Sequence, residues 1–289
     1  MRYAELVKYY EELEATTKKL EKRGILSELY RRSDNLEVVV PLSMGVIFPA
    51  GEQELGIARE MIRRVVAKTY GVSEEAVIRQ FKDTGDLGLA AEFFASHRKQ
   101  KPLAHKNLTI SNVFDNLRKL PEITGKGSQE RKISLVSELL SNSSPKEAKY
   151  VVRTVLGDMR IGVAAGIVRD AIYMAFDQEA RAVEHAFNIL GDYGKVAEMA
   201  KKGKIKAEIA VGRPVRVMLA ERAPDLKTAL EEFENPVLEW KYDGFRTQIS
   251  KDDGKIKVFS RRMEDVTNQF PDIVQLAKEN IKAKKCIIE

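Results

Sequence analysis

Apolar residues recur with helical spacing along residues 1–205. The segment from Leu55 to Tyr70 shows this most clearly, with apolar side chains at Leu55, Ala58, Met61, Ile62, Val65, Val66 and Tyr70. Residues three and four positions apart lie on the same face of a helix, so this spacing gives one buried stripe. The first part of the chain is therefore predicted to be almost entirely helical.

Capping signals mark where two of these helices begin. Ser73 precedes an acidic pair, which is typical of an N-cap followed by acids in the first turn. Ser144-Pro145-Lys146-Glu147 combines a capping serine, a proline at the first helical position and a glutamate at the third. This second helix is expected to end near Gly157, and a further helix is expected to cover Ala164 to Phe176.

The pattern changes to one typical of strands after about residue 205. Strands are predicted over Arg213–Leu219, Val237–Ser250 (as one or two strands), Lys255–Arg261 and, at the end of the chain, from Cys286 onward. Asp253-Gly254 is a strong hairpin-turn signal, and a helix is predicted over Gln269–Ala283. These elements indicate a β-rich domain whose remaining strands would lie downstream.

The composition is that of a globular protein with a charge-rich surface, since 44% of its residues are hydrophobic and 32% are charged. A net charge of +6 would attract phosphate polyanions, although 49 basic and 43 acidic residues also describe an ordinary solvated surface. No apolar run approaches the ~20 residues of a membrane span. A single cysteine, Cys286, excludes an intramolecular disulfide. We expect a monomeric cytoplasmic protein with no membrane contact.

The candidate chemistry lies in Glu239-Trp240-Lys241-Tyr242-Asp243-Gly244-Phe245-Arg246. If this segment is a strand, its side chains alternate, so that Lys241 lies on one face and Leu238, Trp240 and Tyr242 lie on the other, where they would pack into the core. A lysine is a nucleophile only when it is deprotonated, and burial or neighbouring cations lower its pKa. Arg246 and, across the predicted hairpin, Arg261 could supply that field. The alternative is an exposed hairpin with solvated lysine and arginine side chains.

Three motifs in this half resemble those of covalent nucleotidyltransferases, the class that contains ligases and mRNA capping enzymes. Lys241-Tyr242-Asp243-Gly244 resembles the lysine motif, and Phe259-Ser260-Arg261-Arg262 resembles the ligase motif that follows it. Gly212-Arg213-Pro214-Val215-Arg216-Val217-Met218-Leu219-Ala220 resembles the segment that precedes the lysine motif in ATP-dependent DNA ligases, with Val217 in place of the usual second proline.

Four motifs in the helical half narrow the resemblance to ATP-dependent DNA ligases of the archaeal and eukaryotic type. They are Gly85-Asp86-Leu87-Gly88, Gly125-Lys126-Gly127-Ser128, Glu147-Ala148-Lys149-Tyr150 and Met159-Arg160-Ile161-Gly162-Val163, in the order found in that family. The resemblance implies a multidomain α and α+β protein. Residues 1–208 would form an all-helical DNA-binding domain, and residues 209–289 the incomplete start of a β-rich adenylation domain.

The resemblance also implies roles for individual residues. Lys241 would attack the α-phosphate of ATP and carry AMP, Glu239 would contact the adenine, and Arg246 and Arg261 would contact the ribose or phosphates. Mg²⁺ is implied as a second cofactor, with no ligand to it expected within this chain. The next family motif is cut at Glu289, so this chain by itself is expected not to ligate DNA.

The implied partner of the helical half is nicked duplex DNA, held through its phosphates. Glycine-rich turns and helix N-termini offer backbone N–H groups to phosphate. The predicted contacts are Arg160, Gly162, Gly125, Gly127, Ser128 and Lys149, with Arg153 and Arg169 as further charges. Family members also dock on a sliding clamp through a loop that corresponds to Gln100-Lys101-Pro102-Leu103-Ala104, where the usual aromatic pair is missing, so clamp binding is expected to be weak or absent.

Two other functions fit the same residues. One is a non-catalytic module that binds nicks or duplex DNA and whose lysine motif is vestigial. The other is a different covalent nucleotidyltransferase, such as an RNA ligase or capping enzyme. The helical half argues against the second of these, because small viral ligases and capping enzymes lack it.

Overall fold

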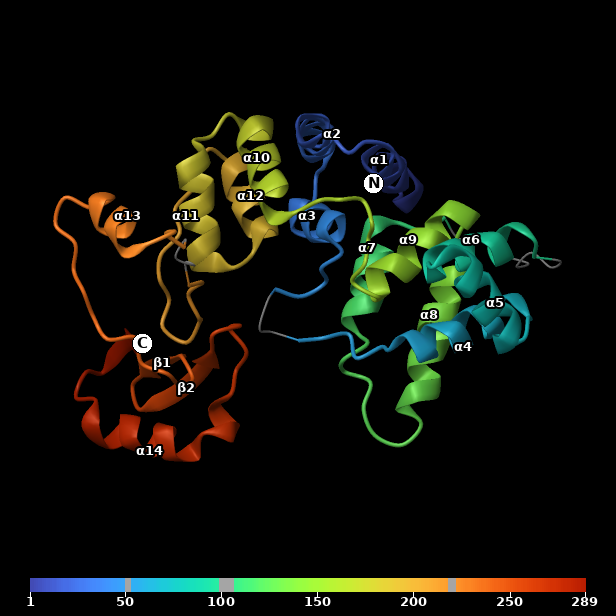
Figure 1. Cartoon of the computed structure of the whole chain (residues 1–289). Helices are drawn as coiled ribbons and strands as arrows, with labels where there is room; N and C mark the ends of the chain where they lie inside the picture. Colours follow the sequence, from blue (N-terminus) through green and yellow to red (C-terminus); the bar gives the residue numbers. More distant parts are fainter. Residues whose placement is uncertain (50–52, 99–106, 218–221) are drawn as a thin grey trace. The chain divides into compact units, whose positions relative to one another are not determined.

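The computed structural model describes residues 1–49, 53–98, 107–217 and 222–289. These residues form two compact units, Met1–Ala207 and Glu208–Glu289. Figure 1 shows the helices of the first unit in blue to yellow and the small sheet of the second in orange to red. The clamp loop predicted at Gln100–Ala104 lies outside the described residues, as do residues 218 and 219 of the predicted first strand.

Every named element in the described part of the first unit is an α-helix, as the apolar spacing predicts. Its helices are α1 (Tyr3–Ala15), α2 (Lys19–Arg32), α3 (Leu36–Met44), α4 (Arg59–Tyr70), α5 (Glu74–Thr84), α6 (Leu87–Ser96), α7 (Ile110–Arg118), α8 (Ser128–Ser141), α9 (Pro145–Val155), α10 (Ala165–Phe176), α11 (Ala180–Leu190) and α12 (Tyr193–Lys201). The predicted helix from Leu55 begins later, at Arg59, because Gly56 has a left-handed φ of 62° and Ala58 is extended.

The predicted helix starts at Ser73 and Ser144 are confirmed. The Ser73 side chain accepts a hydrogen bond from the Ala76 backbone N–H, and Ser144 forms a capping box with Glu147. In the capping box the Glu147 carboxylate accepts from the Ser144 backbone N–H at 2.8 Å. Each terminus is thus specified by residues within one turn of it.

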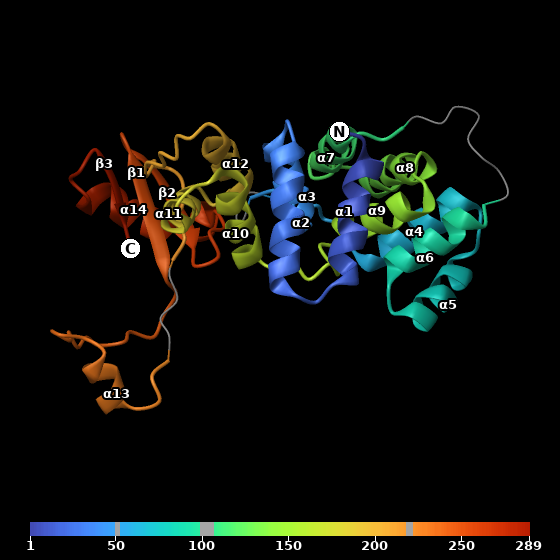
Figure 2. The same cartoon turned by 90° about the horizontal axis from the view of Figure 1, so that it is seen from above.

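The helices of the first unit pack in pairs around one core. α6 packs on α9, α4 on α8, α2 on α10 and α3 on α12 (Figure 2). The largest fully buried side chains include four tyrosines, Tyr3, Tyr10, Tyr30 and Tyr150. The rings of Tyr10 and Tyr150 lie 5.0 Å apart between centroids, so α1 and α9 share this part of the core. None of the helices in the described part of the chain is long and apolar enough to cross a bilayer.

The second unit holds an antiparallel sheet in the order β2-β1-β3, with β1 (Thr247–Asp252), β2 (Lys255–Ser260) and β3 (Lys285–Ile288). The predicted hairpin turn is confirmed, since Asp253 and Gly254 join β1 to β2 with φ values of 43° and 87°. The predicted helix is α14 (Pro271–Asn280), which packs on β2. A short helix, α13 (Leu226–Glu231), and the 3-10 turn Thr267–Gln269 complete the unit.

The strand predicted at Arg213–Leu219 is not formed in its described part, residues 213–217. Side chains of β1 hold this segment instead. The buried Gln248 amide donates to the Val215 carbonyl at 2.7 Å and accepts from the Val215 N–H at 2.9 Å, and Ser250 Oγ accepts from the Gly212 N–H. An amide side chain thus takes the place of a neighbouring strand's peptide group, so the segment is bound to the sheet without joining its ladder.

Candidate functional site

The segment that carries Lys241 is exposed and belongs to no helix or strand, and β1 begins only at Thr247. Leu238, Trp240 and Tyr242 are 77%, 86% and 87% exposed, so the prediction that they pack into a core is wrong for this chain. Alternation buries one face of a strand only if a partner strand and a second layer cover it. The β1–β2 and β1–β3 pairings begin after this segment, so its apolar side chains have no such cover.

The sheet brings Arg246 and Arg261 to the same end of the β1–β2 hairpin. Thr247 pairs with Ser260, so the two arginines directly flank the last pair of the ladder. Arg246 forms an ion pair with Glu289, and Gln248 donates to the same carboxylate at 3.1 Å. The hydrogen bond from Arg246 lowers the pKa of the Glu289 carboxyl group. Lys241 and Glu239 lie in the exposed segment that leads into this end of the sheet.

Ser260 fixes the turn that carries Arg261. Its Oγ accepts from the backbone N–H groups of Arg262 at 3.2 Å and Glu264 at 3.3 Å, and it donates to the Glu264 carboxylate at 3.0 Å. Arg261 itself is exposed and follows β2 directly. In the part of the chain that the structure describes, no three His, Cys, Asp or Glu side chains lie close enough together to hold a metal ion.

Arg160 lies in the loop between α9 and α10 with its backbone in the left-handed region, at φ 54°. Its guanidinium is 42% exposed and donates to the Gly85 carbonyl at 2.8 Å and to the Asp158 carboxylate at 3.1 Å. The structure therefore brings the Gly85–Gly88 and Met159–Val163 motifs together, although they are far apart in sequence. Gly88 permits the close packing of α6 on α9, because a Cβ there would lie 2.8 Å from the Lys149 carbonyl oxygen.

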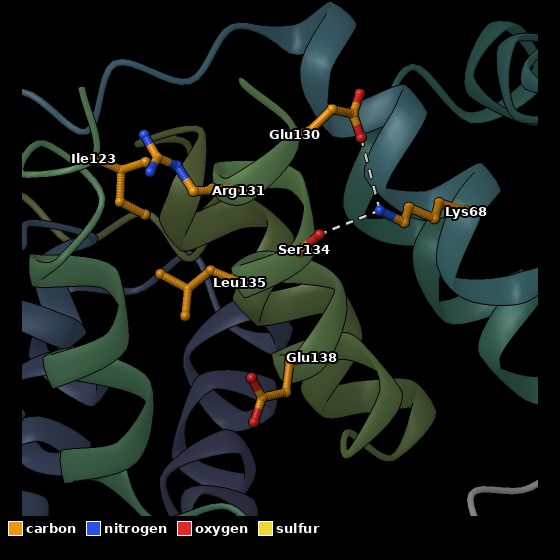
Figure 3. A pocket seen from close by; sticks show the side chains of 7 residues that line it. All are labelled: Lys68, Ile123, Glu130, Arg131, Ser134, Leu135 and Glu138. Carbon is orange, nitrogen blue, oxygen red and sulfur yellow. Dashed lines mark hydrogen bonds and ion pairs between the residues drawn. The ribbon is translucent and has the colours of Figure 1, made fainter. Parts of the chain in front are cut away.

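The glycines of the Gly125–Ser128 turn are also left-handed, at φ 80° for Gly125 and 78° for Gly127. Gly127 is the N-cap of α8 and supplies no side-chain hydrogen bond to its first turn. The turn lies beside a cavity of about 410 Å³ whose lining residues include Ile123, Glu130 and Arg131 (Figure 3). The Ser128 N–H donates to the Gly125 carbonyl at 3.1 Å, and the Glu130 carboxylate lies in the first turn of α8.

Lys149 is brought to the same region as Arg160 but points into the protein. Its side chain is 7% exposed, and its amine forms ion pairs with Glu11 at 2.8 Å and Glu14 at 2.9 Å. The predicted contact of Lys149 with DNA therefore has no geometric support. Arg153, predicted as a further charge, is likewise buried at 3% exposure between Glu14 and Asp86. Arg169 is half-buried and paired with Asp170 at 2.8 Å.

Comparison with known protein families assigns both units. A family described as "DNA ligase N terminus" matches residues 2–173, and one described as "ATP dependent DNA ligase domain" matches residues 217–289. The chain belongs to the family of ATP-dependent DNA ligases. The fold class that the motifs implied, a helical region followed by a short sheet region, is confirmed.

The ligase relatives that the chain matches are archaeal proteins. It is 41% identical over 296 residues to a DNA ligase of Nanoarchaeum equitans, with 100% of this chain and 52% of the relative covered. It is 40% identical to DNA ligases of Thermococcus onnurineus and Methanobrevibacter smithii, covering 53% and 54% of those proteins. The chain thus spans about half the length of the curated relatives it matches.

Sequence reasoning missed the acidic side of the buried ion-pair network in this ligase chain. Glu11 and Glu14 on α1 hold Lys149 and Arg153 on α9, and Asp86 at the start of α6 holds Arg153 as well. On an isolated amphipathic helix, Glu11 and Glu14 are indistinguishable from solvated acids. Of these acids, only Asp86 had a local sequence signal, the Asp-x-Gly pattern of a helix N-cap. That pattern predicts the cap but not the ion pair with Arg153.

This network predicts a loss of stability in acid. Partial burial raises the pKa of the Glu11 carboxyl, but hydrogen bonds from Lys146, Lys149 and Tyr150 outweigh it and lower the pKa to about 2. The pKa of Glu14 is lowered to about 2 in the same way, with Arg153 as its strongest partner. A lowered folded-state pKa gives stability that is present above the unfolded pKa and lost as pH falls through the folded value. Unfolding free energy should therefore fall between about pH 4.5 and pH 2.

The measurement is urea unfolding at a series of pH values for the parent and for Glu14→Gln. The variant should be less stable at pH 7, and the difference from the parent should shrink towards pH 2. A difference that stays constant with pH would contradict the assignment of the network's charge to Glu14.

Proposed function

We propose that this chain is the N-terminal half of an ATP-dependent DNA ligase that seals nicks in duplex DNA through a lysyl-AMP intermediate. In this proposal the helical unit binds nicked duplex DNA, and the second unit contributes the adenylated lysine. The observation that carries the proposal is the match of the two ligase families to the two units in the order that the motifs implied. Such an enzyme would act in DNA replication, repair and recombination.

DNA binding by the helical unit is proposed to centre on Arg160. An arginine in a left-handed conformation, half exposed and held by a backbone carbonyl, presents a preset guanidinium to a phosphate oxygen. Gly162 and the turn Gly125, Gly127 and Ser128 would add backbone N–H contacts. Contacts of this kind do not depend on base sequence, as an enzyme that acts on any nick requires.

Adenylation is proposed at Lys241. Its amine would attack the α-phosphorus of ATP, so that a P–N bond forms, the bond to the pyrophosphate oxygen breaks, and the amine loses a proton. AMP would then pass to the 5′-phosphate of the nick, and the 3′-hydroxyl would displace it. Glu239 is proposed to contact the adenine, and Arg246 and Arg261, at one end of the hairpin, the ribose or phosphates. Mg²⁺ would supply charge neutralisation on the transferring phosphate when bound.

A second candidate is favoured by one observation, the exposure of the Lys241 segment. The chain as it stands would then serve as a non-catalytic nick-binding module. The third candidate, an RNA ligase or capping enzyme, is disfavoured by the match to the DNA ligase N terminus over residues 2–173. Clamp docking at Gln100–Ala104 has no support among the described residues.

The test is the affinity of this chain for a nicked duplex measured by fluorescence anisotropy over a range of salt concentrations. Binding should weaken linearly on a log–log plot, with a slope of roughly −0.9 for each phosphate contact. Arg160→Ala should weaken binding about tenfold and remove roughly one contact from the slope. Arg32→Ala, which removes an exposed arginine of α2, is the matched control and should do neither. Parent binding that does not depend on salt, or an Arg160→Ala variant equal to the parent, would overturn the proposal for DNA.

A further inference from the structure

In the loop between α9 and α10, successive side chains alternate between the core and the surface. Met159 and Ile161 are buried at 6% and 2% exposure, while Arg160 between them is half exposed. The backbone carbonyls of the two buried residues, Met159 and Ile161, each accept a hydrogen bond from a buried cationic side chain. Arg153 donates to the Met159 carbonyl at 3.3 Å, and Lys22 donates to the Ile161 carbonyl. Two buried cations, one on each side of Arg160, therefore hold the left-handed loop that displays it.

Lys22 is an unusual member of this pair. It lies on α2 and is 5% exposed, and its amine also donates to the Leu13 carbonyl at the end of α1, at 2.8 Å. Among the described residues no carboxylate lies within ion-pair distance of this amine, so its partners are neutral carbonyls. Burial lowers the pKa of the Lys22 amine. A buried cation without a counter-charge costs stability unless it is hydrogen-bonded, and here the Leu13 and Ile161 carbonyls accept from it.

Gly162 completes the arrangement. Its φ is 62°, and a Cβ at this position would lie 2.6 Å from the Lys22 amine. The glycine thus gives the amine access to the Ile161 carbonyl at the one point where a side chain would block it. Lys22 therefore joins the ends of α1 and the α9–α10 loop at a point adjacent to Arg160.

We propose that Lys22 is a positioning residue for DNA binding, whose buried amine holds the Ile161–Gly162 backbone so that Arg160 meets a phosphate. The inference rests on the proposed binding of duplex DNA by Arg160. Lys22 itself touches no DNA in this proposal, since its amine is enclosed by α1 and the loop. Its effect on DNA must therefore pass through Arg160, and this dependence can be measured.

The experiment compares nicked-duplex affinity and its salt slope for Lys22→Met, Arg160→Ala and the double variant. Methionine keeps the length of the lysine side chain but has no N–H to donate. Lys22→Met is expected to weaken binding several-fold and to lower the slope by roughly one phosphate contact, although the residue is buried. The double variant should bind like Arg160→Ala alone, because the contact that Lys22 supports is already absent. Lys19→Met, an exposed lysine on the same helix, controls for the lost charge and should keep the parent slope.

The outcomes separate the two proposals. If Arg160→Ala binds like the parent, the proposed DNA contact fails. If Arg160→Ala weakens binding but Lys22→Met keeps the parent slope, the contact stands and the positioning role of Lys22 is overturned. If the two losses add in the double variant, Lys22 acts independently of Arg160 and the inference is also overturned. If Lys22→Met does not fold by circular dichroism, Lys22→Gln, which keeps one amide donor, takes its place in the same cycle.

Discussion

Replacing Lys241 with alanine is expected to abolish covalent adenylation in a form of the protein that has the full length of its relatives. The proposed chemistry requires one primary amine, and alanine leaves no group that can form the P–N bond. Intact mass after incubation with ATP and Mg²⁺ should show the parent heavier by one AMP and the variant unchanged. Lys255→Ala, on the exposed start of β2, removes a nearby lysine and should leave the adduct intact.

For the 289-residue chain by itself we expect little or no adenylation. Its Lys241 segment is exposed, and the side chains that flank the lysine, Trp240 and Tyr242, are exposed as well. Without such enclosure we expect no stoichiometric adduct under the same conditions. A full adduct on this chain, or an adduct on full-length Lys241→Ala, would contradict the assignment.

Asp86→Ala is expected to lower the free energy of unfolding of the helical unit by about 3 kcal/mol, because the buried Arg153 guanidinium loses the Asp86 carboxylate and keeps only that of Glu14. Asp86 and Arg153 are 4% and 3% exposed, with Nη2 to Oδ2 at 2.6 Å and Nε to Oδ2 at 3.0 Å. Asp86 also caps α6 by accepting from the Gly88 N–H at 2.7 Å. Urea unfolding followed by circular dichroism measures the loss.

Asp192 provides a matched control for the Asp86 result. It starts α12 with the same Asp-x-Gly pattern and accepts from the Gly194 N–H at 2.9 Å, but no buried arginine depends on it. Asp192→Ala should therefore cost only about 1 kcal/mol, the usual contribution of a cap. Combining Asp86→Ala with Arg153→Met should restore part of the loss, since the buried guanidinium that lost its Asp86 partner is then absent. Equal losses at positions 86 and 192 would show that capping alone explains Asp86.

What the sequence predicts well is what nearby residues determine. The capping box at Ser144 and the hairpin turn at Asp253-Gly254 are each specified within four residues, and both form as predicted. The same holds for α14, although it is shorter than its apolar pattern because Pro271 sets its first turn.

What the sequence predicts poorly depends on partners far along the chain. Lys149 lies on a helix whose lysine could face solvent or core, and only the acids of α1, 138 residues away for Glu11, decide that it is buried. The prediction for the surroundings of Lys241 is wrong for a related reason. Alternation along a strand buries one face only when other strands and a second layer cover that face. In both places the motif was identified but the side chain's surroundings could not be.

If Arg160 binds a phosphate as proposed, its left-handed conformation sets stability and DNA binding against each other. A side chain with a Cβ loses roughly 1–2 kcal/mol in that region of backbone space, and glycine does not. Selection for heat resistance alone would thus favour glycine at this position and discard the guanidinium. A variant selected only for thermal stability would therefore be expected to carry glycine at position 160, to keep its fold and to bind nicked DNA more weakly.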